Sequence, residues 1–216
     1  MQTNALEYLN QTAARFPHHS AVRDAGGSYT FGEFRSEALA LASALVHRAD
    51  TTNTPIAVYL PKSKEAVLCF AAILYSGNCY APLDVKSPAA RMSAVLQKLA
   101  ATFVITNRAN LAELRKTGVP EDRIVVLEET LRGAVTPALE RRFERLIDTD
   151  PIYIIHTSGS TGIPKGVTIA HRGVIDYIEW ANSVYRVDEN TVIGSITSTT
   201  PRSIFISVFR AAPCSI

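Results

Sequence analysis

Short apolar segments alternate with longer amphipathic segments along this chain, and that alternation limits the folds open to it. The apolar segments are the length of buried strands and lie at residues 56–60, 103–106, 124–127 and 152–155. Between them, apolar residues recur at helical spacing, as at residues 31–48 and 64–75. Strands that are apolar on both faces belong to parallel sheets covered by helices. The sequence therefore predicts an α/β fold with parallel sheets layered with helices.

Turn and capping signals place the remaining elements. A first helix is expected at residues 5–16, before Pro17, and Gly26-Gly27 predicts a hairpin between strands containing Val22 and Tyr29. Ser87 followed by Pro88 is typical of an N-cap and first helical position, which predicts a helix reaching residue 100. Further elements are expected at residues 79–82 (strand), 109–116 (helix) and 128–149 (a charged, irregular surface connection). We expect one α/β unit with no internal domain boundary.

Composition excludes several classes of protein. The chain has 216 residues, of which 47% are apolar, and its 22 basic and 20 acidic residues give a net charge of +2. This balance argues against a nucleic-acid partner or a polybasic membrane anchor. No apolar run approaches the ~20 residues of a membrane span, and the polar start does not resemble a signal peptide. We therefore expect a cytoplasmic protein.

The cysteines do not form a metal site or a disulfide framework. Cys69, Cys79 and Cys214 are odd in number and lack metal-ligand spacing, and the first two lie among apolar residues. They are interpreted as reduced structural thiols, and no metal-ligating residue is identified.

The segment TSGSTGIPKG at residues 157–166 carries the strongest functional signal. It lies between the apolar segment 152–155 and a second strand-like segment at 167–169. Unobstructed glycine amides, hydroxyls and a lysine suit a polyphosphate ligand. A Walker A loop is disfavoured, since Pro164 precedes Lys165 and Gly166 follows it where Ser or Thr would stand. A plain Gly/Ser turn is the alternative.

This segment resembles the phosphate loop of the adenylate-forming enzymes, which include acyl-CoA synthetases and the adenylation domains of nonribosomal peptide synthetases. Similar family motifs occur in order across roughly residues 4–209, at 28–34, 74–84, 150–155 and 171–174. Their spacing looks most like the amino-acid-activating branch, with its peptide synthetase modules and D-alanine–carrier protein ligases. The resemblance implies that residues 1–216 are an incomplete N-terminal portion of the large AMP-binding domain. The C-terminal portion and the small lid domain would lie beyond it.

The resemblance also implies roles for the loop residues. The phosphates of ATP would be cradled by the hydroxyls and backbone of Thr157, Ser158, Gly159, Ser160, Thr161 and Gly162. Lys165 would help to position the departing pyrophosphate, with Mg²⁺ shielding the phosphates. The partners implied are ATP, a carboxylic or amino acid, and the thiol of a carrier protein or coenzyme A. A hydroxyl-rich turn with a solvent-exposed lysine is the alternative, and no catalytic residue is identified.

Other residues near these motifs receive structural interpretations. His156 stands where the family most often has tyrosine and is interpreted as a packing variant rather than a base. Asp84 is expected to cap or brace the backbone, and Trp180 to lie in the core. Surface positions are expected for four arginines, Arg91, Arg141, Arg142 and Arg145.

The end of the chain departs from the family pattern. Phe205 falls where amino-acid-activating relatives place the aspartate that pairs with the substrate's ammonium, and burying that charge unpaired would be costly. Either the substrate lacks an α-amino group, or this segment no longer performs recognition. The leading hypothesis is the N-terminal part of an ATP-dependent carboxylate-adenylating ligase. The alternative is a truncated, catalytically inactive nucleotide-binding or interaction module.

Overall fold

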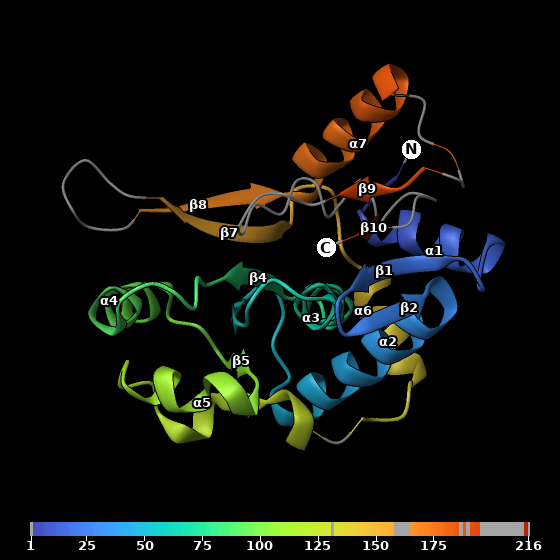
Figure 1. Ribbon diagram of the computed structural model, residues 1–216. Coiled ribbons are helices and arrows are strands. Elements are labelled where there is room, and N and C mark those ends of the chain that lie inside the picture. Colours follow the sequence, from blue (N-terminus) through green and yellow to red (C-terminus); the bar gives the residue numbers. More distant parts are fainter. Residues whose placement is uncertain are drawn as a thin grey trace.

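The computed structural model describes residues 2–130, 132–157, 165–185, 188 and 191–194, together with the backbone of 214–215. Its described strands form two sheets (Figure 1). The larger has the order β6-β5-β3-β4-β7-β8, made of Ile124–Val126, Val104–Thr106, Pro55–Tyr59, Cys79–Pro82, Pro151–Thr157 and Lys165–Ala170. The smaller has the order β2-β1-β10-β9, made of Gly27–Thr30, Ser20–Asp24, Cys214–Ser215 and Ile193–Gly194.

The six-stranded sheet confirms the predicted fold class. Every neighbouring pair in it is parallel except β7 with β8, which is antiparallel. From the central strand β3 the chain passes through α3 (Lys64–Tyr75) to β4, and then through α4 (Ala89–Leu99) to β5 on the opposite side of β3. This change of direction requires helices on both faces of the sheet.

The two faces of the sheet bury separate apolar clusters. Along β3, Ile56 and Val58 contribute to the larger cluster, which also contains α1 (Leu6–Arg15), α2 (Phe31–Arg48) and α3. Ala57 and Tyr59 point the other way, into the cluster of α4 and α5 (Arg108–Arg115). Because strand side chains alternate between faces, a strand apolar at every position is covered on both sides.

Capping residues explain why several helices begin where the sequence predicts. Thr30 and Glu33 form a reciprocal capping box at the start of α2, and the Ser63 hydroxyl accepts a hydrogen bond from Ala66 N at 3.2 Å in α3. The predicted bounds 31–48 and 64–75 are confirmed. The predicted Ser87 cap is wrong: α4 begins at Ala89 after Pro88 and has no side-chain cap.

The region 128–149 is more ordered than the sequence predicted. It contains α6 (Pro137–Glu144), whose Leu139 is buried and whose Phe143 ring packs edge-on against Tyr75 at 5.3 Å between centroids. α6 packs against α2 and α3. The prediction failed because only one narrow side of this short, charged helix is apolar, too little to produce a clear periodic signal.

The hairpin expected at Gly26-Gly27 is confirmed as the antiparallel pair β1 and β2. Two 3-10 turns, Glu121–Arg123 and Leu127–Glu129, flank β6. Within the described part of the chain, no helix is long and apolar enough to cross a membrane.

The last described helix, α7 (His171–Tyr185), extends away from the β7–β8 hairpin (Figure 1). It contains Trp180, which the sequence analysis placed in the core. That prediction is wrong for this chain, because 51% of Trp180 is exposed. In the described structure only one side of α7 is buried, at His171, Val174, Ile178 and Ala181.

Candidate functional site

The candidate phosphate loop connects two paired strands. Strand β7 runs parallel to β4, so Thr157 stands at its carboxyl end, and β8 returns antiparallel beside it. The last ladder pair is Thr157 with Lys165, and the pair before it is His156 with Gly166. The predicted connection between two strands is confirmed at both ends. Ser158, Gly159, Ser160, Thr161 and Gly162 lie outside the described residues, as does Phe205.

Carboxyl ends of parallel strands are where α/β proteins bind ligands, because the connections leave a crevice there. The ends of β3 and β4, at Tyr59 and Pro82, lie at the same edge as Thr157. The topology therefore presents Thr157 and Lys165 at the ligand-binding edge of the sheet.

His156 is a packing residue at the base of the hairpin, as expected. A Cβ added to Gly166 would lie 3.4 Å from His156 Nε2 and 3.2 Å from Ile154 Cγ2, so the imidazole occupies the space that glycine leaves. Burial lowers the pKa of His156, and the nearby positive charges of Lys98 and Arg91 lower it further. The ring is thus neutral at physiological pH and is held against the opposite strand.

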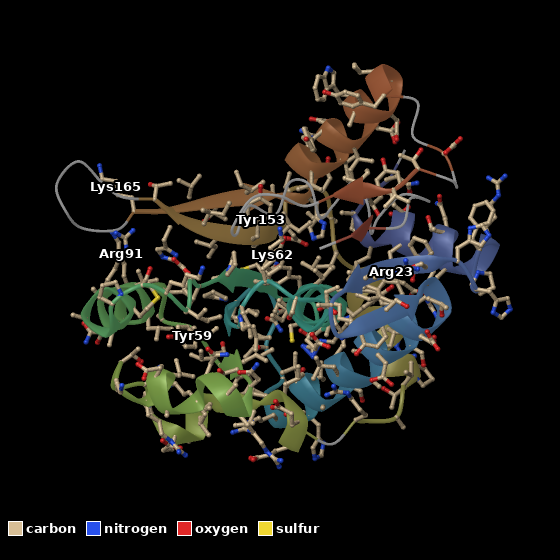
Figure 2. All side chains as sticks on the ribbon, in the orientation of Figure 1. Arg23, Tyr59, Lys62, Arg91, Tyr153 and Lys165 are labelled. Carbon is tan, nitrogen blue, oxygen red and sulfur yellow. The ribbon has the colours of Figure 1, made fainter. Side chains whose placement is uncertain are left out.

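A cavity of about 80 Å³ lies between the hairpin and the start of α4, lined in part by Asp84, Ser87, Arg91 and His156. Arg91 is exposed, as predicted, and reaches from α4 toward the hairpin end that carries Lys165 (Figure 2). The carboxylate of Asp84 accepts hydrogen bonds from Lys86 N at 3.0 Å and from the Ser87 hydroxyl at 3.4 Å. Asp84 therefore braces the turn, as the sequence analysis expected.

Aromatic side chains of α3 and β4 pack beside Tyr153 of β7. Phe70 stacks on Tyr80 with 4.3 Å between centroids, and Tyr80 lies 5.7 Å from Tyr153. All three are buried, and burial raises the pKa of Tyr80 well above its usual value. A strand packed this tightly gives the loop a rigid starting point.

The start of α7, which follows β8, is held by contacts with the segment just before β7. His171 N donates to the Asp150 carbonyl at 3.0 Å, and Arg172 pairs with Asp148 at 2.8 Å. The His171 ring is fully buried, and its Nδ1 accepts a hydrogen bond from Ala5 N at 3.1 Å. In the sequence His171 stands out only as part of the family-like motif at 171–174, because no local pattern reveals a contact with a residue 166 positions away.

The arginines expected at the surface divide into two groups. Arg141 and Arg145 are exposed, as predicted. Arg142 is not a solvated charge: its side chain is 15% exposed, pairs with Asp50 and donates to the Thr51 carbonyl at 2.9 Å.

Cys69 and Cys79 are buried free thiols, as expected, and burial raises the pKa of Cys69 to about 12.

The AMP-binding enzyme family model matches residues 9–206, which is most of the chain. The chain belongs to this family.

Two relatives and one solved structure agree with this assignment. Tyrocidine synthase 1 of Brevibacillus parabrevis is 28% identical over 192 residues, and syringomycin synthase SyrB1 of Pseudomonas syringae pv. syringae is 31% identical over 182 residues. These matches cover 89% and 83% of this AMP-binding chain. The nonribosomal peptide synthetase FmoA3, in its AMPPNP-bound form, superposes with a TM-score of 0.84 at 23% identity over 99% of the chain. The fold is that of the N-terminal part of an adenylation domain.

The chain is short beside the proteins it matches. It spans 17% of tyrocidine synthase 1, 28% of syringomycin synthase SyrB1 and 22% of the FmoA3 chain. Each of those proteins therefore contains much more polypeptide than these 216 residues.

Proposed function

We propose that this chain is the N-terminal part of an ATP-dependent carboxylate-adenylating ligase, with the loop at 157–166 as its phosphate-binding element. The observation that carries the proposal is the pairing of Thr157 with Lys165 at the carboxyl end of β7. It brings a hydroxyl and an ammonium to the two ends of a glycine-rich connection, in a chain of the AMP-binding family.

The proposed reaction joins a carboxylate to the AMP moiety of ATP, releases pyrophosphate, and passes the acyl group to a thiol. In this proposal Thr157, Ser158, Ser160, Thr161 and the amides of Gly159 and Gly162 bind the phosphates. Lys165 offsets the charge of the leaving pyrophosphate. Such charge stabilisation works through several groups at once, so the loop supplies only part of what catalysis needs.

Mg²⁺ would reach this site with the nucleotide. The described residues contain no group of three or more His, Cys, Asp or Glu side chains that could hold a metal. Mg²⁺ commonly binds through one or two carboxylates together with substrate phosphates, and its chemistry here would be to neutralise phosphate charge. The exposed hydroxyl and ammonium at the loop ends are compatible with such a complex.

Nucleotide binding tests the proposal directly. Isothermal titration of the chain with Mg²⁺–ATP should show binding that Lys165→Ala weakens severalfold. Substitution of Lys116, an exposed lysine directly after α5, by alanine should leave that binding unchanged. Equal effects of the two substitutions, or no binding by the parent chain, would contradict the phosphate assignment. A panel of amino acids and their deamino analogues, added with ATP, then tests whether an ammonium is recognised.

The short span of the match favours a second candidate, a nucleotide-binding or interaction module without catalytic activity of its own. The chain covers 17% and 28% of the two relatives. ATP–pyrophosphate exchange separates the candidates when the chain is joined to the later part of an adenylation domain, because a module without catalytic activity would bind nucleotide there and still not exchange pyrophosphate.

A further inference from the structure

A larger cavity lies at the edge of the six-stranded sheet opposite the candidate phosphate loop. Its volume is about 880 Å³, within the range of roughly 300–1,000 Å³ that is usual for small-molecule sites. Its lining includes Asn53, Gly77 and Asp150, which lie just before the first residues of β3, β4 and β7. Because these strands are parallel, their amino ends share one edge of the sheet. We call this space the amino-edge cavity.

The amino-edge cavity is remote from the phosphate loop. Strand β7 separates Asp150 from Thr157, and an extended segment of that length spans roughly 20 Å at about 3.3 Å per residue. In the view of Figure 1, α3 lies between α6 and the end of the hairpin that carries Lys165. A ligand in the cavity would therefore occupy a different site from the nucleotide proposed above, and the inference does not depend on that proposal.

One wall of the cavity is the loop before β3, which hydrogen bonds hold in place. Asn53 has a left-handed backbone conformation with φ 53°, which asparagine adopts more readily than most residues. Its backbone N donates to the Gly77 carbonyl at 2.8 Å, and its side chain donates to the Asp150 carboxylate at 3.0 Å. The Asn78 side chain accepts from Thr54 N at 3.2 Å. The wall is therefore preformed, as the walls of ligand sites usually are.

Three arginines of one short segment also line the cavity. Arg141 and Arg142 belong to α6, and Arg145 is its C-cap residue. Arg142 is committed to Asp50 and the Thr51 carbonyl. Arg141 and Arg145 are exposed and form no ion pair with any residue that the structure describes. They are four positions apart, so both lie on the same face of the helix.

Hydrogen-bond donors are in excess around the cavity. The two carboxylate oxygens of Asp150 already accept hydrogen bonds, from Asn53 Nδ2 and from Ile147 N, each at 3.0 Å. The Asp50 carboxylate pairs with Arg142, and its side chain is 84% exposed to water. Nε of Arg142 is buried without a hydrogen-bond partner in the described structure. With the nearby carboxylates engaged and two guanidiniums unpaired, the cavity favours a ligand that is rich in acceptors.

We propose that the amino-edge cavity binds a small oxyanion, a molecule carrying a phosphate or carboxylate group, through Arg141 and Arg145. A guanidinium presents parallel N–H donors that match two oxygens of either group, which a single point charge does not. Thr136, the N-cap of α6, and Ala138 in its first turn line the same cavity. The positive end of the helix dipole therefore adds to the attraction for an anion.

Amide NMR with two probes, inorganic phosphate and citrate, tests the proposal at constant ionic strength. At least one probe should shift the amides of Asn53 and Gly77 saturably, and Arg141→Gln combined with Arg145→Gln should weaken this binding at least fivefold. Arg23→Gln combined with Arg123→Gln removes the same charge from exposed positions elsewhere and should leave the binding unchanged. Tighter binding of phosphate would identify a phosphorylated ligand, and tighter binding of citrate a carboxylate.

The proposal is overturned if neither probe shifts these two amides, or if both pairs of substitutions weaken binding equally. Shifts confined to Gly166 would place the anion at the phosphate loop instead, so this site and the nucleotide site can fail separately.

Thermal unfolding provides the check on folding. Because both arginines are exposed, the Arg141→Gln and Arg145→Gln variant should unfold at the parent temperature without ligand. The tighter-binding probe should raise the unfolding temperature of the parent and of the Arg23→Gln and Arg123→Gln control more than that of this variant. An equal rise in all three proteins, or a variant that no longer folds, would contradict the assignment of Arg141 and Arg145 as free ligand-binding residues.

Discussion

The backbone amide of Ala5 donates a hydrogen bond to Nδ1 of His171 at 3.1 Å, joining the start of α1 to the start of α7. Because Nδ1 accepts this bond, the imidazole proton resides on Nε2, which is buried without a hydrogen-bond partner. Burial lowers the pKa of His171 to about 4, and the Asp150 carboxylate opposes this only in part. Protonation of Nδ1 would break this hydrogen bond between Ala5 and His171.

This arrangement predicts acid sensitivity. The unfolded chain binds a proton at His171 near the ordinary pKa of 6.5, and the folded chain only near 4. The stability that comes from the neutral His171 ring is therefore fully present above pH 6.5. As pH falls from 6.5 to 4, the free energy of unfolding drops by on the order of 3 kcal/mol.

Urea denaturation at a series of pH values measures that loss. His171→Asn, whose amide oxygen can accept from Ala5 N, should flatten the pH dependence, whereas His18→Asn on the exposed surface should not. An unchanged slope in His171→Asn would mean that other groups cause the acid sensitivity.

Adjacent arginines on α6 should behave differently. Arg142 pairs with Asp50 and with the Thr51 carbonyl while nearly buried, so Arg142→Ala should lower the free energy of unfolding by about 1–3 kcal/mol. Arg141 is exposed, so Arg141→Ala should change the free energy of unfolding by less than about 0.5 kcal/mol. Chemical denaturation of both variants checks this, and equal losses would contradict the assigned contacts.

Gly166 and His156 should be coupled. A methyl group at residue 166 would crowd Ile154 and the imidazole, so Gly166→Ala should cost about 1 kcal/mol or more. In the His156→Ala background the ring is gone and the same substitution should cost less. A double-mutant cycle on unfolding free energies measures the coupling. Additive effects would show that the ring does not rest on Gly166.

The 216-residue chain alone should form no appreciable acyl-adenylate. The resemblance to adenylate-forming enzymes implies that the C-terminal portion and the small lid domain lie beyond these residues, and adenylation needs charge stabilisation from several groups at once. ATP–pyrophosphate exchange with a panel of carboxylic acids is the measurement. Exchange well above background that Lys165→Ala abolishes would prove this expectation wrong and would favour autonomous catalysis.

Much of this architecture follows from local sequence. Helices at 31–48 and 64–75 have predictable bounds because side chains within a few positions, Thr30 with Glu33 and Ser63 with Ala66 N, cap them. The apolar strands imply a parallel sheet because no other setting covers both of their faces. The glycine-rich segment after a buried strand likewise identified the candidate site, since the ligand chemistry of such a loop is local.

Contacts between distant segments were decided by the tertiary structure alone. Arg141 and Arg142 look alike in sequence, and only the packing of α6 against α2 and α3 brings Arg142 to Asp50. Only long-range packing brings His171 to Ala5, 166 positions away, and leaves Trp180 51% exposed. Periodicity tells which side of a helix is apolar, but the partner of that side is chosen by long-range packing, which leaves no local pattern.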